Sequence, residues 1–377
     1  MLKFNKDGKF GILLFGDLHE KPDCRESLRF KDMQKLMNAS LERYKPDLCV
    51  LLGDIFDTEV CRDDPAAFSE YIELLCRPMT SKGIPVAAIM GNHEHDPGCD
   101  DEVIKAYSEL SGVMMRCEGV PGKADYKEIL YSHDGKKPLA ALWFLDSNNL
   151  CADESASKYD YVHTDQIEWF EKESEKLREI NGGKPMPSYI FQHIPVPEEY
   201  DLLRPAKLYE IPWSVDGFGK QSGTRFVKAE GTQGYLGEGP CSPDINNGQF
   251  ESWKRTGGVR AAFFGHDHLN DFSGFVDGIF LAQHKTAGFR AYTDGCHSCV
   301  RFIEITENDP GSYRQELRHY KDFGINCECL GPVMKRFTDR QVMAVHSLNY
   351  CACALASAGL LTYFVKEIIK ERRERNG

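Results

Sequence analysis

The sequence predicts a mixed α/β (α+β) fold, and two observations carry this prediction. Over about the first two-thirds of the 377 residues, short apolar runs alternate with segments that have the 3.6-residue period of amphipathic helices. Several of these apolar runs end in Asp, Asn or His, mostly next to a glycine. Polar side chains suited to chemistry are therefore expected at the ends of buried strands.

The elements follow one another in a regular order. Residues 12–15 are an apolar run that ends at Gly16-Asp17, and residues 28–44 place apolar side chains on one helix face. The next expected elements are strand 48–52, helix 68–75, strands 86–90 and 139–145, helix 164–180, and strands 189–191 and 259–264. The last strands are expected to be antiparallel because turn residues separate them: 272–276, 278–282 and 300–305. Residues 195–254 have no clean period and predict a functional loop region.

These elements suggest one domain with an appendage. We expect the main domain over residues 1–306, a polar connector over 307–341, and an apolar helix with a basic tail over 342–377. Residues 342–365 contain no Asp, Glu, Lys or Arg and are long enough to cross a bilayer. We therefore expect a C-terminal membrane anchor, and the alternative is a final helix docked on the soluble domain.

Composition excludes some classes of function. The net charge of −12 argues against binding of long nucleic acids, which needs a basic surface. It does not exclude an anionic substrate, because bound metal ions reverse the local charge. The 14 cysteines, in a long chain whose start does not resemble a signal peptide, predict reduced thiols and a cytoplasmic location.

Three cysteine pairs have spacings close to those of metal ligands: Cys296/Cys299, Cys327/Cys329 and Cys351/Cys353. A structural zinc site needs four ligands from two well-spaced pairs. We therefore expect these cysteines to be free thiols.

The most informative feature is a set of five polar motifs that follow apolar runs. They are Asp17-Leu18-His19, Gly53-Asp54-Ile55-Phe56-Asp57, Gly91-Asn92-His93-Glu94, Gln192-His193 and Gly265-His266-Asp267-His268. Each motif alone could be a turn or a hydrogen-bonded loop. Because strand ends meet at one edge of a sheet, the five together predict one site. Carboxylate, amide and imidazole ligands suit Mn, Fe or Zn.

These motifs resemble those of the calcineurin-like metallophosphoesterase superfamily, and the chain is similar to its short purple-acid-phosphatase-like branch over roughly residues 10–305. The motif Gly265-His266-Asp267-His268-Leu269-Asn270-Asp271-Phe272 is the most specific part of the resemblance. The resemblance implies a β-sandwich of two mixed sheets flanked by helices, with the site at the sheet edge.

The resemblance also implies a role for each motif. Asp54 would bridge two divalent metal ions, and His93 would protonate the leaving oxygen. The first ion would be bound by Asp17, His19, Asp54 and His268, and the second by Asp54, Asn92, His193 and His266. Asn92 could also contact the phosphate.

Asp57 is expected to orient His93, although a turn carboxylate that caps a helix is the alternative. Purple acid phosphatases have a Tyr at this position, so the resemblance implies no visible charge-transfer band here and an optimum at neutral to mildly alkaline pH. Glu94, Asp146 and Asp267 are expected to accept hydrogen bonds from ligand histidines.

The implied activity is hydrolysis of small phosphomonoesters by a metal-bound hydroxide. The alternative is a phosphodiesterase that acts on cyclic nucleotides or other small diesters. An inactive scaffold is disfavoured, because all seven ligand positions and His93 are present.

Overall fold

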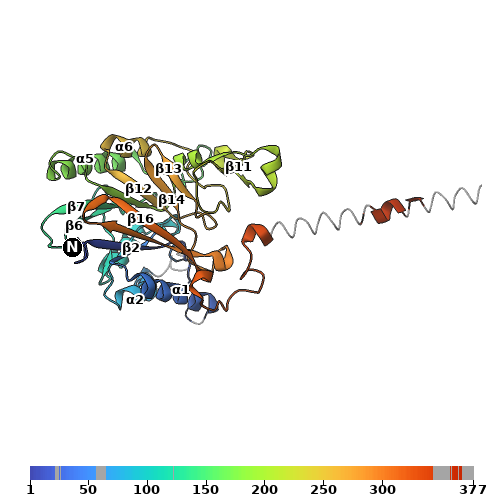
Figure 1. Ribbon diagram of the computed structural model, residues 1–377, viewed down its shortest axis with the longest axis horizontal. Coiled ribbons are helices and arrows are strands. Elements are labelled where there is room, and N and C mark those ends of the chain that lie inside the picture. Colours follow the sequence, from blue (N-terminus) through green and yellow to red (C-terminus); the bar gives the residue numbers. More distant parts are fainter. Residues whose placement is uncertain are drawn as a thin grey trace, which may run out of the picture.

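Two large mixed β-sheets, flanked by helices, make up the protein (Figure 1). The computed structural model describes residues 1–21, 25, 27–56, 65–121, 123–342, 357, 359–363 and 365–366. In Figure 1, α1 and α2 cover one side of the paired sheets, and α5 and α6 cover the other. The α/β architecture expected from the sequence is confirmed.

The first sheet has six strands. Their order is β16 (Asp309–His319), β15 (Cys299–Thr306), β2 (Lys9–Phe15), β3 (Leu48–Leu51), β4 (Val86–Ala88) and β5 (Val113–Met114). The strands from β2 to β5 are parallel, whereas β15 and β16 are antiparallel to their neighbours. The carboxyl ends of β2, β3 and β4 therefore lie at one edge.

The second sheet has seven strands. Their order is β1 (Leu2–Lys3), β6 (Tyr126–Tyr131), β7 (Pro138–Leu145), β8 (Ser188–Gln192), β12 (Val259–Phe264), β14 (Ile279–Gln283) and β13 (Ser273–Val276). The strands β7, β8, β12 and β14 are parallel, and β13 closes the sheet as an antiparallel partner of β14.

The helices are α1 (Leu28–Tyr44), α2 (Pro65–Thr80), α3 (Asn92–His95), α4 (Asp100–Glu109), α5 (Thr164–Ile180) and α6 (Gln249–Thr256). Helix α1 begins after Ser27, whose side chain accepts a hydrogen bond from the backbone N–H of Arg29. It ends at Lys45, which has a left-handed backbone. The face that it buries includes Met33 and Leu36, as its apolar period predicts.

The central strands are buried on both sides. Along β7, Leu142 and Phe144 belong to the core between the sheets, and Trp143 belongs to the core under α5 and α6. This alternation follows from the two-residue period of a strand. Phe144, Phe191 and Phe263 stack across three neighbouring strands. Burial on both faces explains why these strands are continuous apolar runs.

Two regions differ from the sequence-based expectation. Strand β16 lies at 309–319, inside the expected connector, and pairs with β15 over most of its length. Residues 195–254 form a small sheet of β10 (Val215–Asp216), β11 (Arg225–Lys228) and β9 (Leu203–Pro205), the 3-10 segments η3 (Pro197–Leu202), η4 (Leu208–Trp213) and η5 (Gly219–Gln221), and α6.

The expected anchor at 342–365 falls mostly outside the described residues. Within the part of the chain that the structure describes, we find no helix with the length and apolar character needed to cross a membrane. The expected C-terminal apolar helix is thus not supported. Asp57 also lies outside the described residues.

Candidate metal centre

Five parallel strands bring the predicted site residues to one place. Asp17 and His19 follow β2, Asp54 follows β3, and Asn92 and His93 follow β4. From the second sheet, His193 follows β8, and His266 and His268 follow β12. The backbone N–H of Gly265 donates to His193 O at 3.1 Å, so the two loops of the second sheet are joined at the site.

The ligand atoms form two neighbouring groups. In the first, Nε2 of His268 lies 2.9 Å from Nε2 of His19 and 3.7 Å from Oδ1 of Asp17. The second group contains Asp54, His193 and His266. Within each group, every ligand atom lies within 4.8 Å of the others.

Asp54 lies between the two groups. Its Oδ2 is 3.1 Å from Nε2 of His193 and 3.6 Å from Nε2 of His19. Asn92 belongs with the second group, since its Oδ1 lies 3.2 Å from Nε2 of His193. One carboxylate therefore faces ligand atoms of both groups.

Two buried polar atoms at the site lack a hydrogen-bond partner among the protein atoms that the structure describes. Oδ2 of Asp17 and Nε2 of His266 are buried and have no hydrogen-bond partner. Buried polar atoms are nearly always partnered, and bound ions are one explanation when they are not. The oxygen and nitrogen donors also match the ligands that Mn, Fe and Zn accept. The residues present thus fit two cations.

Local backbone strain is concentrated at the same loops. Asp17, His19, Asp54 and His266 have left-handed backbones, with φ between 47° and 76°. Such residues cost about 1–3 kcal/mol each and tend to cluster at functional sites. Gly91 is required for a different reason, because a Cβ there would collide with the Asp54 carboxylate.

Backbone carbonyls orient two of the candidate ligand histidines. Nδ1 of His193 donates to Leu52 O at 2.7 Å, and Nδ1 of His268 donates to Tyr292 O at 2.9 Å. Because each Nδ1 carries the proton, each Nε2 is left with a lone pair that faces the centre.

The roles expected for Glu94 and Asp267 were wrong. Glu94 accepts from the backbone N–H groups of Gly91, Asp54 and Ile55, each at 2.8 Å, and so fixes the loops after β3 and β4. Asp267 accepts from a backbone N–H and two side-chain amides, those of Cys241, Asn270 and Gln283. Neither carboxylate contacts a ligand histidine in these hydrogen bonds, because the loops direct both toward amide groups.

His93 faces the centre from the start of α3. Its backbone N–H donates to Oδ1 of Asp54 at 2.8 Å, and its Nδ1 lies 2.6 Å from Oδ2 of Asp96. Burial lowers the pKa of His93, but the hydrogen bond to Asp96 and the negative charge of Asp54 outweigh it and raise the pKa to about 9. Pairing of His93 with Asp57 stays a prediction.

Sequence reasoning missed Asp96. Its spacing of three residues from His93 in a helical segment is the signal that could have found it.

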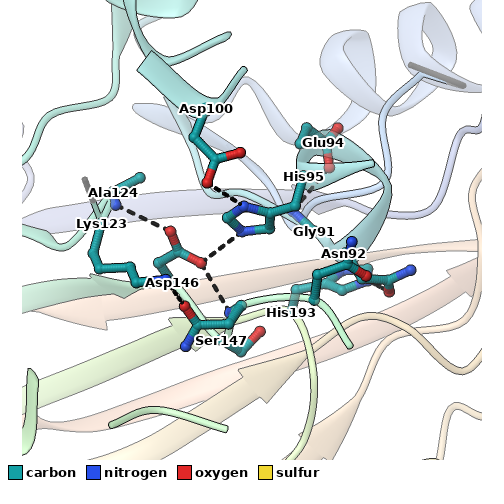
Figure 2. A network of polar contacts seen from close by, with 12 residues as sticks. Gly91, Asn92, Glu94, His95, Asp100, Lys123, Ala124, Asp146, Ser147 and His193 are labelled. Atoms are coloured by element: carbon teal, nitrogen blue, oxygen red, sulfur yellow. Dashed lines mark hydrogen bonds and ion pairs between the residues drawn. The ribbon is translucent and has the colours of Figure 1, made fainter. Parts of the chain in front are cut away.

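His95 is a second residue that the sequence reasoning missed. Figure 2 shows its ring between two carboxylates: Nδ1 is 2.9 Å from Asp100 and Nε2 is 2.9 Å from Asp146. Burial opposes charge on His95, but Asp146 and Asp100 raise its pKa to about 10. Asp146 therefore contacts His95, and the expected hydrogen bond from a metal-ligand histidine to Asp146 is not seen in the described part of the chain. This buried ionic network fixes the segment that carries Asn92 and His93.

Two tyrosines also contact the site and were not predicted. The ring of Tyr159 meets His266 edge to face, with centroids 4.3 Å apart, and Tyr292 stacks on His268 at 4.1 Å. Two arginines of residues 195–254 have partners within that segment: Arg204 pairs with Glu210, and Arg225 donates to Ser214.

Comparison with known proteins adds a family assignment. A family model described as calcineurin-like phosphoesterase matches residues 10–270. The chain is 28% identical over 339 residues to "Probable inactive purple acid phosphatase 14" of Arabidopsis thaliana, which covers 80% of this chain and 77% of that protein. It is also 28% identical over 323 residues to "Probable inactive purple acid phosphatase 29" of the same plant, covering 77% and 75%. A dimetal phosphatase structure from Danio rerio is 13% identical, with a TM-score of 0.49, and covers 82% of this chain and 99% of that one.

Proposed function

Since the chain belongs to the calcineurin-like phosphoesterase family, we propose that it hydrolyses small phosphomonoesters at a centre of two divalent metal ions. The observation that carries this proposal is the position of Asp54, whose Oδ2 faces His193 of one ligand group and His19 of the other. A shared carboxylate is what a two-metal centre needs.

The ligand assignment follows the two groups. Asp17, His19, Asp54 and His268 would hold one ion, and Asp54, Asn92, His193 and His266 the other. The ions would be Mn, Fe or Zn. When bound, two such ions lower the pKa of water and neutralise the charge of the phosphoryl oxygens.

His93 would donate the proton that the leaving oxygen needs. Asp96 holds Nδ1 of the ring, with Oδ2 at 2.6 Å, and so orients the imidazole. The Asp96 carboxylate raises the pKa of His93 and so favours the protonated ring, which a general acid requires. The side chain of His93 is 41% exposed, which leaves it accessible to a phosphoester.

Replacement of Asp96 by Asn tests this arrangement. Loss of the carboxylate charge lowers the pKa of His93, so the proton is lost at a lower pH. We expect the alkaline limb of the kcat/KM profile to move down by about one pH unit. A pH profile measured for Asp96→Asn and wild type checks this, and an unchanged alkaline limb would show that another group controls it.

The names of the two plant relatives describe them as probably inactive. A catalytically inactive scaffold is the corresponding alternative for this chain. Against it, all seven ligand positions are occupied by ligand residue types, and His93 faces Asp54. We therefore favour activity.

The substrate class can be tested with two synthetic esters. We expect Mn²⁺-dependent hydrolysis of p-nitrophenyl phosphate to exceed that of bis-p-nitrophenyl phosphate. A strong preference for the diester would favour the phosphodiesterase alternative, which acts on cyclic nucleotides or other small diesters. Hydrolysis of neither ester, with both metal ions bound, would favour the inactive scaffold.

We also propose a cytoplasmic location. All ten cysteines in the described part of the chain are free, as is usual in a reducing compartment. Membrane association through 342–365 stays a prediction.

A further inference from the structure

A second group of candidate metal ligands lies apart from the strand-end site. It contains Asp32 of α1, and Cys327 and Cys329, which follow η7 (Tyr320–Phe323), with their ligand atoms all within 4.8 Å of one another. Cys296 of η6 (Gly295–His297) interacts with Cys327 at the edge of this group. Asp32, Cys296 and Cys327 are buried, and Cys329 is half-buried. Nothing in the proposed hydrolytic reaction uses these residues.

The distances between these side chains match a metal site. Sγ of Cys327 lies 3.7 Å from Sγ of Cys329 and 3.4 Å from Oδ2 of Asp32. Two zinc–sulfur bonds of about 2.3 Å at the tetrahedral angle separate the sulfurs by about 3.8 Å. A disulfide would instead require about 2.05 Å. Cys296, which interacts with Cys327, is the candidate for a fourth donor.

The surrounding contacts hold the group in place. Oδ2 of Asp32 accepts from the backbone N–H groups of Glu328 and Cys329, at 2.6 and 2.7 Å. These bonds fix the loop that carries both Cys327 and Cys329. Nζ of Lys35 lies 2.8 Å from Oδ1 of Asp32 and offsets part of the negative charge that ionised thiols would add.

We propose that Asp32, Cys296, Cys327 and Cys329 bind one structural zinc ion. Thiolate ligands favour zinc over harder ions such as Mn²⁺, and four protein ligands are typical of a structural site. Binding forms three Zn–S bonds and one Zn–O bond, and the three thiol protons pass to solvent. The ion ties the segment after β16, which has little regular structure, to α1.

This proposal departs from the free thiols expected from sequence spacing. Sequence spacing suggests Cys296 and Cys299 as a pair of possible ligands. In the structure, however, Sγ of Cys299 points toward Lys285 O, 3.8 Å away. Asp32 lies 295 residues before Cys327, so no local motif could reveal it.

Cobalt substitution provides the test, because only thiolate ligands give thiolate-to-cobalt charge-transfer absorption in the near ultraviolet. The strand-end ligands include no thiolate. We expect the reduced metal-free protein to develop this band and to saturate it with one Co²⁺. The Cys327→Ser/Cys329→Ser double variant should lose the band, whereas Cys151→Ser, which changes a half-buried thiol elsewhere, should keep it.

A second measurement uses the wild-type chain and so does not depend on folding of the variant. Zinc-loaded protein is treated with a mercurial thiol reagent in the presence of a zinc-responsive dye. We expect one zinc ion to be released as the thiols are modified. No charge-transfer band in the wild type, a band that persists in the double variant, or no zinc release with thiol modification would each overturn the proposal.

Discussion

Replacement of Asp54 by Ala is expected to remove both hydrolytic metal ions together and to reduce hydrolysis to background. Asp54 faces ligand atoms of both groups, so its loss deprives each ion of a ligand. It would also leave His193 and His19 without the nearest negative charge. Metal analysis after Mn²⁺ loading and gel filtration measures the effect directly, alongside p-nitrophenyl phosphate hydrolysis.

Asp47→Ala is the matched control for Asp54→Ala. Asp47 is a half-buried carboxylate that accepts a hydrogen bond from the backbone N–H of Gly11 at 2.8 Å, away from the ligand groups. This variant should keep both ions. Normal Mn²⁺ content in Asp54→Ala, or loss of only one ion, would contradict the bridging role.

Replacement of His93 by Ala is expected to preserve metal binding and to lower turnover by about 10²–10⁴-fold, the usual contribution of a general acid. The loss should depend on the ester. A p-nitrophenolate leaving group needs little protonation, whereas an alkoxide needs much more. The reduction in kcat should therefore be smaller for p-nitrophenyl phosphate than for an alkyl phosphate.

The control for His93→Ala is His133→Ala, which removes an exposed histidine that pairs with Glu307. It should behave like the wild type. An equal loss on both esters in His93→Ala would show that His93 orients the phosphate without protonating the leaving group.

The strands that form the site could be predicted from the sequence, because a strand that is buried on both faces consists of consecutive apolar residues. Residues 259–264 and 188–192 are examples, and a candidate ligand histidine follows each within two residues. The convergence of the ligands follows from parallel pairing of these strands. By contrast, β16 has no buried residue in its eleven and has the sequence pattern of a polar connector, although it pairs with β15 over most of its length.

Other parts of the site depend on tertiary geometry that no local pattern encodes. The left-handed backbones of Asp17 and Asp54 are set by contacts between loops, as when Asp17 N–H donates to Gly53 O. The network around His95 joins residues 51 positions apart. Glu94 could be identified as part of a motif, but its partners became visible only when the loops after β3 and β4 were in place.

The central claim is that the strand-end ligands form a hydrolytic centre of two metal ions. Stepwise addition of Mn²⁺ to the chelated protein, with binding and p-nitrophenyl phosphate hydrolysis followed in the same samples, tests it most directly. Mn²⁺ binds oxygen and nitrogen ligands and competes poorly for thiolates, so the cysteine group should not contribute. We expect activity to rise with the amount of Mn²⁺ bound and to reach its maximum at two Mn²⁺ per chain. Two bound ions without hydrolysis, or full activity with none, would contradict the claim.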